Sequence, residues 1–154
     1  MEIYIDNRQD KVEIDESIYE VLEEVIKQCL ILEGKPLNYE ISLSFVDNEE
    51  IRILNREYRS VDRETDVLSF PMEEEDFLVP MPLLGDIIIS AEKALEQSKE
   101  YGHSLFREIS YLTAHSMFHL LGYDHMEEDE KKIMRNKEKE VMKKLKIFKE
   151  RRGD

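Results

Sequence analysis

The sequence predicts a single α+β domain, residues 1–154, in which about five helices pack on a small mixed sheet of about four strands. A chain of this length normally folds around one core, and its 41% of hydrophobic residues is typical of a globular protein. Segments with strand-like and helix-like periodicity follow in the order strand, helix, strand, helix, two strands and three helices. This order favours helices packed on one mixed sheet, but it leaves the order of the strands open.

The first half of the chain alternates strands with helices. Residues 2–6 and 41–45 alternate apolar with polar side chains, which is the pattern of a strand with one buried face. Between them, residues 18–30 carry apolar side chains at helical spacing, and Gly34 ends that helix. A capping box at Asp47 begins the next helix. The side chains that this second helix turns inward are expected to be Ile51, Leu54 and Tyr58.

Two more strands follow, separated by a loop. Residues 65–70 form the first, and Thr65 and Asp66 at its start either support the turn before the strand or line a cleft. The continuous apolar run at 87–89 is typical of a strand buried on both faces. The loop at 72–82 between them is either a flap over a site or a plain surface loop.

Three helices complete the chain. Ser90 caps the first, which ends at Gly102, and Ser104 begins the second. The third helix begins with acidic residues from Glu127 and ends with basic residues from Lys143, and both charges are favourable with the helix dipole. The side chains that this last helix turns inward are expected to be Ile133, Met134, Val141, Leu145 and Phe148.

Three of the four histidines cluster at the end of the second of these helices. His115 and His119 are four residues apart and therefore project from one helical face. Gly122 suits the left-handed conformation that ends a helix, so the chain can turn back and bring His125 to the same point. Three imidazoles suit one divalent ion per chain, zinc by default, and leave one coordination position open, as in catalytic sites. His103 lies about three turns away and is expected at the surface or as a cap.

Four arginines form a stripe on the helix that begins at Asp47. Arg52, Arg56, Arg59 and Arg63 follow at spacings of four, three and four residues, provided that the helix extends far enough. Such a stripe is either a solvated face paired with nearby carboxylates or a row of phosphate contacts. Both interpretations stay open for Arg52, Arg56 and Arg63.

Two stretches of the sequence resemble motifs of a known family. Residues 115–125 read H-S-M-F-H-L-L-G-Y-D-H, and residues 55–71 read N-R-E-Y-R-S-V-D-R-E-T-D-V-L-S-F-P. Both resemble the motifs of the YbeY family, bacterial zinc-dependent endoribonucleases of rRNA maturation, and L-G-D-I at 84–87 resembles a third, weaker motif. One difference is Ser116, because the family usually has glycine there. Its side chain would narrow a cleft if it pointed into one.

The resemblance implies a function and a set of site residues. Arg59 would contact the phosphate or the transition state, since a guanidinium holds a phosphate through two parallel hydrogen bonds. Zinc held by the three histidines would support cleavage of single-stranded RNA, with either an activated water or the RNA's own 2′-hydroxyl attacking phosphorus. The family role would be maturation of the 3′ end of 16S rRNA and ribosome quality control, with the ribosome or its proteins as partners. Further candidate substrate contacts are Arg56, Arg63 and Ser116.

Two other functions fit part of the same pattern. The spacing of the histidines and Gly122 is also that of zincin metallopeptidases, H-E-x-x-H-x-x-G-x-x-H. Those enzymes need a glutamate directly after the first histidine as general base, and Ser116 cannot take a proton near neutral pH. A non-catalytic, zinc-stabilised module that docks on the ribosome would need a fourth ligand, for which Asp124 is the candidate.

The composition limits the possible partners. The formal net charge of −14, from 36 acidic and 22 basic residues, disfavours general nucleic-acid affinity, and no DNA partner is expected. Any RNA contact must come from a local basic patch and from the metal's own charge. No apolar run approaches the ~20 residues of a membrane span, so no membrane partner is expected. The start of the chain lacks a secretory pattern and Cys29 is the single cysteine, which favours a cytoplasmic location.

Overall fold

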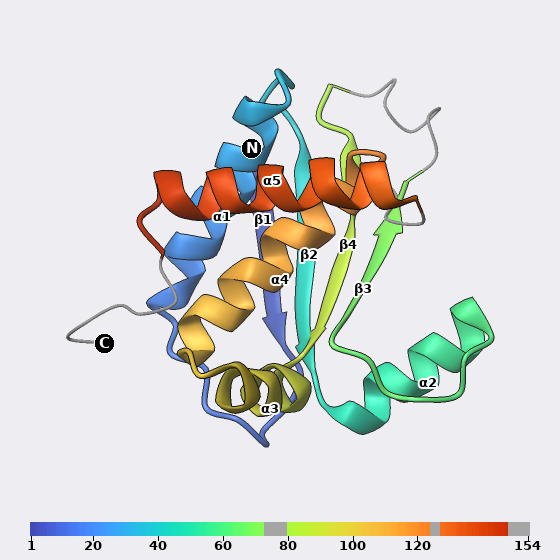
Figure 1. Ribbon diagram of the computed structural model, residues 1–154. Coiled ribbons are helices and arrows are strands. Elements are labelled where there is room, and N and C mark those ends of the chain that lie inside the picture. The colour runs from blue at the N-terminus through green and yellow to red at the C-terminus, as the bar shows by residue number, and fades with distance from the viewer. Residues whose placement is uncertain (73–79, 124–126, 148–154) are drawn as a thin grey trace.

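One mixed sheet organises the chain (Figure 1). The structure is a computed structural model that describes residues 1–72, 80–123 and 127–147. The sheet has the order β1-β2-β4-β3, with parallel pairing from β1 to β2 to β4 and antiparallel pairing of β3 with β4. Its strands are β1 (Glu2–Asn7), β2 (Glu40–Val46), β3 (Val67–Pro71) and β4 (Leu83–Ser90). The helices of the described ranges are α1 (Ile18–Leu32), α2 (Asn48–Arg59), α3 (Ala91–Tyr101), α4 (Leu105–Leu120) and α5 (Glu128–Lys144). The predicted α+β class, with a four-stranded mixed sheet and five helices, is confirmed.

The two faces of the sheet are covered unequally. α4 lies against one face, and α1, α3 and α5 pack around α4 to enclose the main core. Ile87 and Ile89 of β4 belong to this core. Ile88 between them belongs to a smaller cluster on the opposite face, where it packs with Leu68 of β3 and Ile51 of α2. β4 is therefore buried on both faces, as its unbroken apolar run predicts.

α4 begins and ends where its local signals predict. The Ser104 hydroxyl accepts a hydrogen bond from the backbone of the first turn at 3.1 Å. At the other end, Gly122 has a left-handed φ of 104° and its N–H donates to the His119 carbonyl at 3.0 Å. The Tyr123 N–H donates to the Phe118 carbonyl at 2.9 Å, which completes a Schellman motif. This turn brings the backbone after Gly122 back against the last turn of the helix.

Two predicted inward residues lie outside instead. Tyr58 is 66% exposed, because the end of α2 extends past the sheet, and its ring meets the Phe70 ring in an edge-to-face contact. Ile133 is 50% exposed, because it lies about 100° around α5 from Met134, which faces the core. The apolar pattern of a helix therefore shows neither where its partner surface ends nor which of two adjacent apolar residues faces that surface. Phe148 lies outside the described residues.

The remaining boundaries differ from expectation only locally. β3 begins at Val67 rather than at residue 65, and α5 ends at Lys144. Most of the loop at 72–82 lies outside the described residues, so the flap interpretation stays a prediction. Within the described ranges, no helix combines the length and the apolar character needed to cross a membrane.

Candidate metal centre

The exposed edge of α4 carries the histidine pair. From residue 108 to residue 120 only Tyr111, His115 and His119 are partly exposed, and every other residue is buried. These three follow at four-residue spacing and therefore form one line along the helix. The Nε2 atoms of His115 and His119 lie 3.2 Å apart, with the two rings nearly perpendicular at 85°. The structure thus brings two of the three predicted metal ligands together.

The hydrogen bonds of the other ring nitrogens define the tautomers. His119 Nδ1 lies 2.9 Å from the Tyr123 carbonyl oxygen, which can only accept, so this nitrogen carries the proton. His115 Nδ1 lies 2.6 Å from Glu138 Oε2. Because the other oxygen of Glu138 accepts from the Tyr111 hydroxyl at 2.7 Å, the carboxylate acts as an acceptor on both sides.

Both rings turn their Nε2 atoms toward the same point. Where Nδ1 carries the only proton of each ring, two Nε2 lone pairs meet at 3.2 Å and repel each other unless a proton or a metal ion lies between or beside them. Imidazole nitrogens are preferred zinc ligands, and metal-bound histidines usually donate their other N–H to a carboxylate or a carbonyl. The donor set and its supporting hydrogen bonds fit a divalent metal ion.

Glu138 is the site residue that sequence reasoning missed. It comes from α5, 23 residues beyond His115, and it is only 2% exposed. A buried carboxylate is unfavourable unless it is hydrogen-bonded, and Tyr111 and His115 supply both partners here. Burial, and then the Glu138 carboxylate, raise the pKa of Tyr111, so its hydroxyl stays a donor at neutral pH. The available signal was a glutamate in line with Met134 and Val141 on the apolar face of α5.

The third predicted ligand, His125, lies outside the described residues, and so does Asp124. In the ranges that the structure describes, no three histidine, cysteine, aspartate or glutamate side chains gather as a metal site. The chain does turn back at Gly122, as predicted, and places Tyr123 beside His119. The position of His125 relative to the pair stays a prediction.

Arg59 is linked to the histidine helix through β3. Its guanidinium donates to the Ser69 carbonyl at 2.5 Å and lies over the Phe70 ring, 5.3 Å from the centroid. The Ser69 hydroxyl lies 2.6 Å from the Ser116 hydroxyl, next along α4 from His115. One β3 residue therefore contacts both the predicted phosphate-binding arginine and the helix that presents the metal ligands.

Ser116 itself does not face the open side of α4. It is fully buried, because one residue beyond His115 corresponds to a rotation of about 100° toward the sheet. Its hydroxyl is used in the contact with Ser69. This placement does not support the expectation that Ser116 touches substrate, and it assigns the side chain to holding β3 against α4.

The arginine stripe is shorter than four residues. α2 ends at Arg59, because Ser60 adopts a left-handed φ of 59°, so Arg63 lies beyond the helix. Arg52 pairs with Asp62 at 2.8 Å on the surface, and that hydrogen bond lowers the pKa of Asp62. Arg52 therefore belongs to a solvated face. Arg56 and Arg63 are exposed, and the positive charge of Arg56 also lowers the pKa of Asp62.

Two other candidate residues have structural roles. The Asp66 carboxylate accepts from the Val67 backbone at 2.7 Å and from the Gln97 side chain at 3.2 Å. Gln97 also donates to the buried Glu108, which lies 2.5 Å from His103. His103 was expected at the surface or as a cap, and of these two the surface position is wrong, because its side chain is only 5% exposed. It is buried because the buried Glu108 carboxylate needs hydrogen-bond partners.

Comparison with known proteins places this chain in a family of RNA-cleaving enzymes. The family model described as Endoribonuclease YbeY matches residues 4–146. A protein of that name from Clostridioides difficile (strain 630) is 54% identical, over 97% of this chain and 100% of its own length. Another, from Thermoanaerobacter sp. (strain X514), is 57% identical over 96% of this chain and 99% of its own length. The chain belongs to the YbeY family, as its two motifs predict.

A solved structure shares the fold. The solution structure of TM1509 from Thermotoga maritima matches with a TM-score of 0.60 and 26% sequence identity. The match covers 94% of this chain and 91% of that one. The architecture around α4 is therefore part of a fold that extends over nearly the whole chain.

Proposed function

We propose that this chain is a zinc-dependent endoribonuclease that cleaves single-stranded RNA. Membership of the YbeY family supports the cleavage of RNA. The observation that supports a metal is the pair of Nε2 atoms at 3.2 Å, with both Nδ1 atoms held by acceptors. The cellular role that fits the family resemblance is maturation of the 3′ end of 16S rRNA and ribosome quality control in the cytoplasm, with the ribosome or its proteins as partners.

The residues that would hold the ion are His115, His119 and His125, one ion per chain. When bound, a zinc ion polarises phosphodiester oxygens and lowers the pKa of a water molecule toward ~7. The protein's own contribution is to keep each ring in one tautomer and one orientation. Glu138 does this for His115 and the Tyr123 carbonyl does it for His119.

Arg59 supplies the positive charge on the substrate side. Its guanidinium has five N–H donors, and the bond to the Ser69 carbonyl uses one of them. The Phe70 ring beneath it and the Ser69 carbonyl limit its orientations, so the remaining donors are directed before a phosphate arrives. A fixed arginine stabilises the charge that gathers on phosphate oxygens in the transition state. Attack by water and attack by the 2′-hydroxyl both make use of this contact.

The metallopeptidase alternative finds no support in the site. Ser116 occupies the sequence position at which zincins have the glutamate that acts as general base, and its side chain is buried behind the histidines. It therefore lacks both a carboxylate and access to the open side of α4. The alternative of a non-catalytic zinc module depends on residues 124–126, which the structure does not describe.

The test compares metal content with cleavage in matched variants. Zinc-loaded protein is incubated with single-stranded RNA, structured rRNA and casein side by side, and bound zinc is measured by mass spectrometry. We expect the wild type and the exposed-residue control Lys35→Gln to hold one zinc and to cut RNA, and His119→Ala to lose both properties. Full RNA cleavage by a metal-free His119→Ala protein would reject the proposal. Cleavage of casein but not of RNA would favour the peptidase.

A further inference from the structure

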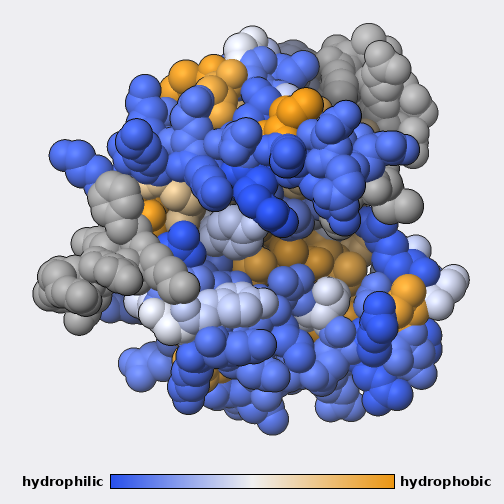
Figure 2. Space-filling view, viewed as in Figure 1, coloured by the Kyte–Doolittle hydropathy of each residue, from blue (hydrophilic) through white to orange (hydrophobic). Residues whose placement is uncertain are grey.

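Two adjoining hollows lie between α4 and α5, beside the histidine pair. The first has a volume of about 220 Å³, and its lining includes His115 and Glu138. The second has a volume of about 390 Å³ and continues along α5 as far as Ile147. Tyr111 and Arg135 line both hollows, so the two form one groove that begins at the metal centre. Figure 2 shows the recess below the hydrophilic surface of α5, with hydrophobic residues in its floor.

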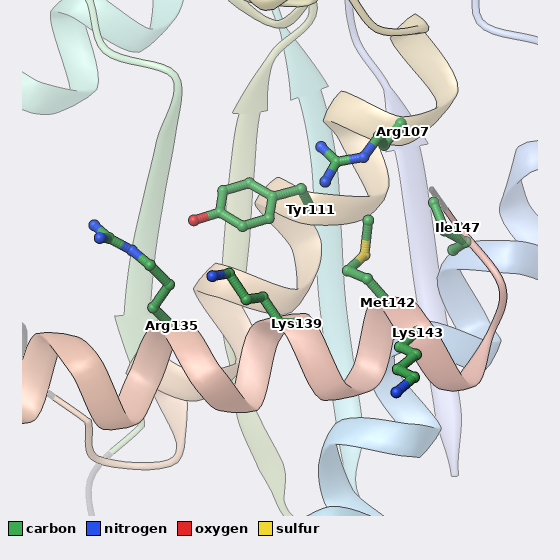
Figure 3. Close-up of a pocket in the computed structure, with 7 residues that line it drawn as sticks. All are labelled: Arg107, Tyr111, Arg135, Lys139, Met142, Lys143 and Ile147. Carbon is green, nitrogen blue, oxygen red and sulfur yellow. The ribbon is translucent and has the colours of Figure 1, made fainter. Parts of the chain in front are cut away.

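The α5 side of this groove is strongly cationic. Lys131, Arg135, Lys139 and Lys143 follow at four-residue spacing, and all four line one or both hollows. Arg107 of α4 lies across from them, and Figure 3 shows Arg135 and Lys139 extending from α5 on the side of Tyr111, whereas Lys143 extends away from α4. Like charges at this helical spacing repel one another. Within the described residues, Arg135, Lys139 and Lys143 form no ion pair with a carboxylate.

The arginine of α4 has an unused donor here. Its guanidinium lies 3.2 Å from His103 Nδ1, but Arg107 Nε is buried and has no hydrogen-bond partner among the described residues. A buried N–H without an acceptor is unfavourable, and such groups commonly mark the place of a missing ligand or water. Because Arg107 lines the second hollow, an anion there would meet its guanidinium side chain and the α5 cations together.

The remaining lining indicates what kind of anion fits. Tyr111 stacks on His115 and presents an aromatic surface between the two hollows, while Met142 and Ile147 make part of the second one apolar. Cations with an aromatic and apolar floor are the combination that binds single-stranded nucleic acid, through phosphates and bases respectively. The chain carries a net charge of −14, so this local concentration of cations differs from the rest of the molecule.

We propose that this α4–α5 groove binds the single-stranded RNA that continues from the cleaved phosphodiester, with Arg135 and Lys139 on its phosphates and Tyr111 against a base. The inference rests on the proposed function, because the groove starts at His115. It adds a binding surface made by α4 and α5, whose lining residues do not include Arg59 or Ser69. RNA too short to reach this groove would be cut with a higher KM than longer RNA.

The test uses two double variants with the same change in net charge. Arg135→Gln/Lys139→Gln removes the groove cations, and Lys35→Gln/Lys144→Gln removes two exposed cations that line neither hollow of the groove. Binding of a fluorescein-labelled single-stranded RNA is followed by anisotropy, in chelator so that no cleavage occurs, at several salt concentrations. Loss of two phosphate contacts should reduce the affinity for RNA by about tenfold or more. The plot of log affinity against log salt should become less steep, with the magnitude of its slope smaller by about 1.4. The matched control should keep both near wild type, and circular dichroism checks that each variant folds.

Three outcomes would contradict RNA binding in the groove. The first is wild-type affinity and salt slope in Arg135→Gln/Lys139→Gln, and the second is an equal loss of affinity in both double variants. The third is displacement of the RNA by polyglutamate at equal charge concentration, which would indicate that an acidic protein binds the groove. Failure of the proposed function is distinguishable, since it appears as a zinc-loaded wild type that does not cut RNA. A selective binding defect in the groove variant would support the groove even in that case.

Discussion

The hydroxyl groups of Ser69 and Ser116 lie 2.6 Å apart and join β3 to α4. On the β3 side, the carbonyl of the same Ser69 holds Arg59, and on the α4 side Ser116 is next to His115. The separation between the predicted phosphate contact and the predicted metal ligands is therefore set partly by this one contact. A shift of β3 along α4 would change the two halves of the site relative to each other.

Removing this contact should cost stability and cleavage without loss of metal. In Ser69→Ala the buried Ser116 hydroxyl loses its partner, so we expect the free energy of unfolding to fall by about 1–3 kcal/mol in urea denaturation. RNA turnover should fall as well, while bound zinc stays the same. The double variant Ser69→Ala/Ser116→Ala serves as control and should be less destabilised than the sum of its single changes. Simple additivity would mean that the two hydroxyls are not coupled.

Arg59→Ala should abolish turnover while the protein keeps its zinc. A positioned donor to transition-state charge is commonly worth about 10²–10³ in kcat. Arg59→Lys should recover only part of the rate, because an ammonium group keeps the charge but not the planar set of donors. The matched control is Arg52→Ala on the same helix, whose arginine is used in a surface ion pair with Asp62. Loss of zinc from Arg59→Ala, or an equal loss of rate in Arg52→Ala, would contradict the assigned role.

Glu138→Gln should weaken metal binding although no direct ligand changes. The carboxylate keeps the proton on His115 Nδ1, and loss of such a supporting group typically costs about 10–100-fold in metal affinity. Zinc titration against a competing chelator measures this effect. Glu140→Gln, an exposed glutamate of the same helix, removes the same charge and should bind zinc as the wild type does. Equal affinities in both variants would show that Glu138 only fills a buried position.

The parts of the fold that could be predicted from the sequence are those set by local chemistry. Ser104 and Gly122 determine the ends of α4 through hydrogen bonds to residues within the adjacent turn, so their residue types alone indicate the geometry. The four-residue spacing of His115 and His119 places them on one face for the same reason. The order of strands in the sheet was not predictable, because the crossover that places β4 between β2 and β3 depends on packing against α4.

The parts that were missed join residues far apart in the chain. Ser116 contacts a residue 47 positions earlier, and Glu138 reaches back 23 positions. Neither contact leaves a periodic signal, although a glutamate on the apolar face of α5 indicates a buried partner. The exposure of Tyr58 also depends on residues far away in the chain, because the extent of the sheet determines which residues of α2 have a surface to pack against.

The hydrogen bond between Tyr111 and Glu138 should make stability depend on alkaline pH. Burial, and then Glu138, raise the pKa of Tyr111 in the folded protein, whereas the unfolded chain releases this proton near pH ~10. The contribution of Tyr111 to the free energy of unfolding is therefore complete below about pH 10. It is lost as the pH rises toward the pKa of Tyr111 in the folded protein. Urea denaturation at about pH 8 and about pH 11 should show a larger loss for the wild type than for Tyr111→Phe, which cannot ionise there. Tyr58→Phe changes an exposed ring and should follow the wild type, and an equally steep loss in Tyr111→Phe would contradict the assignment.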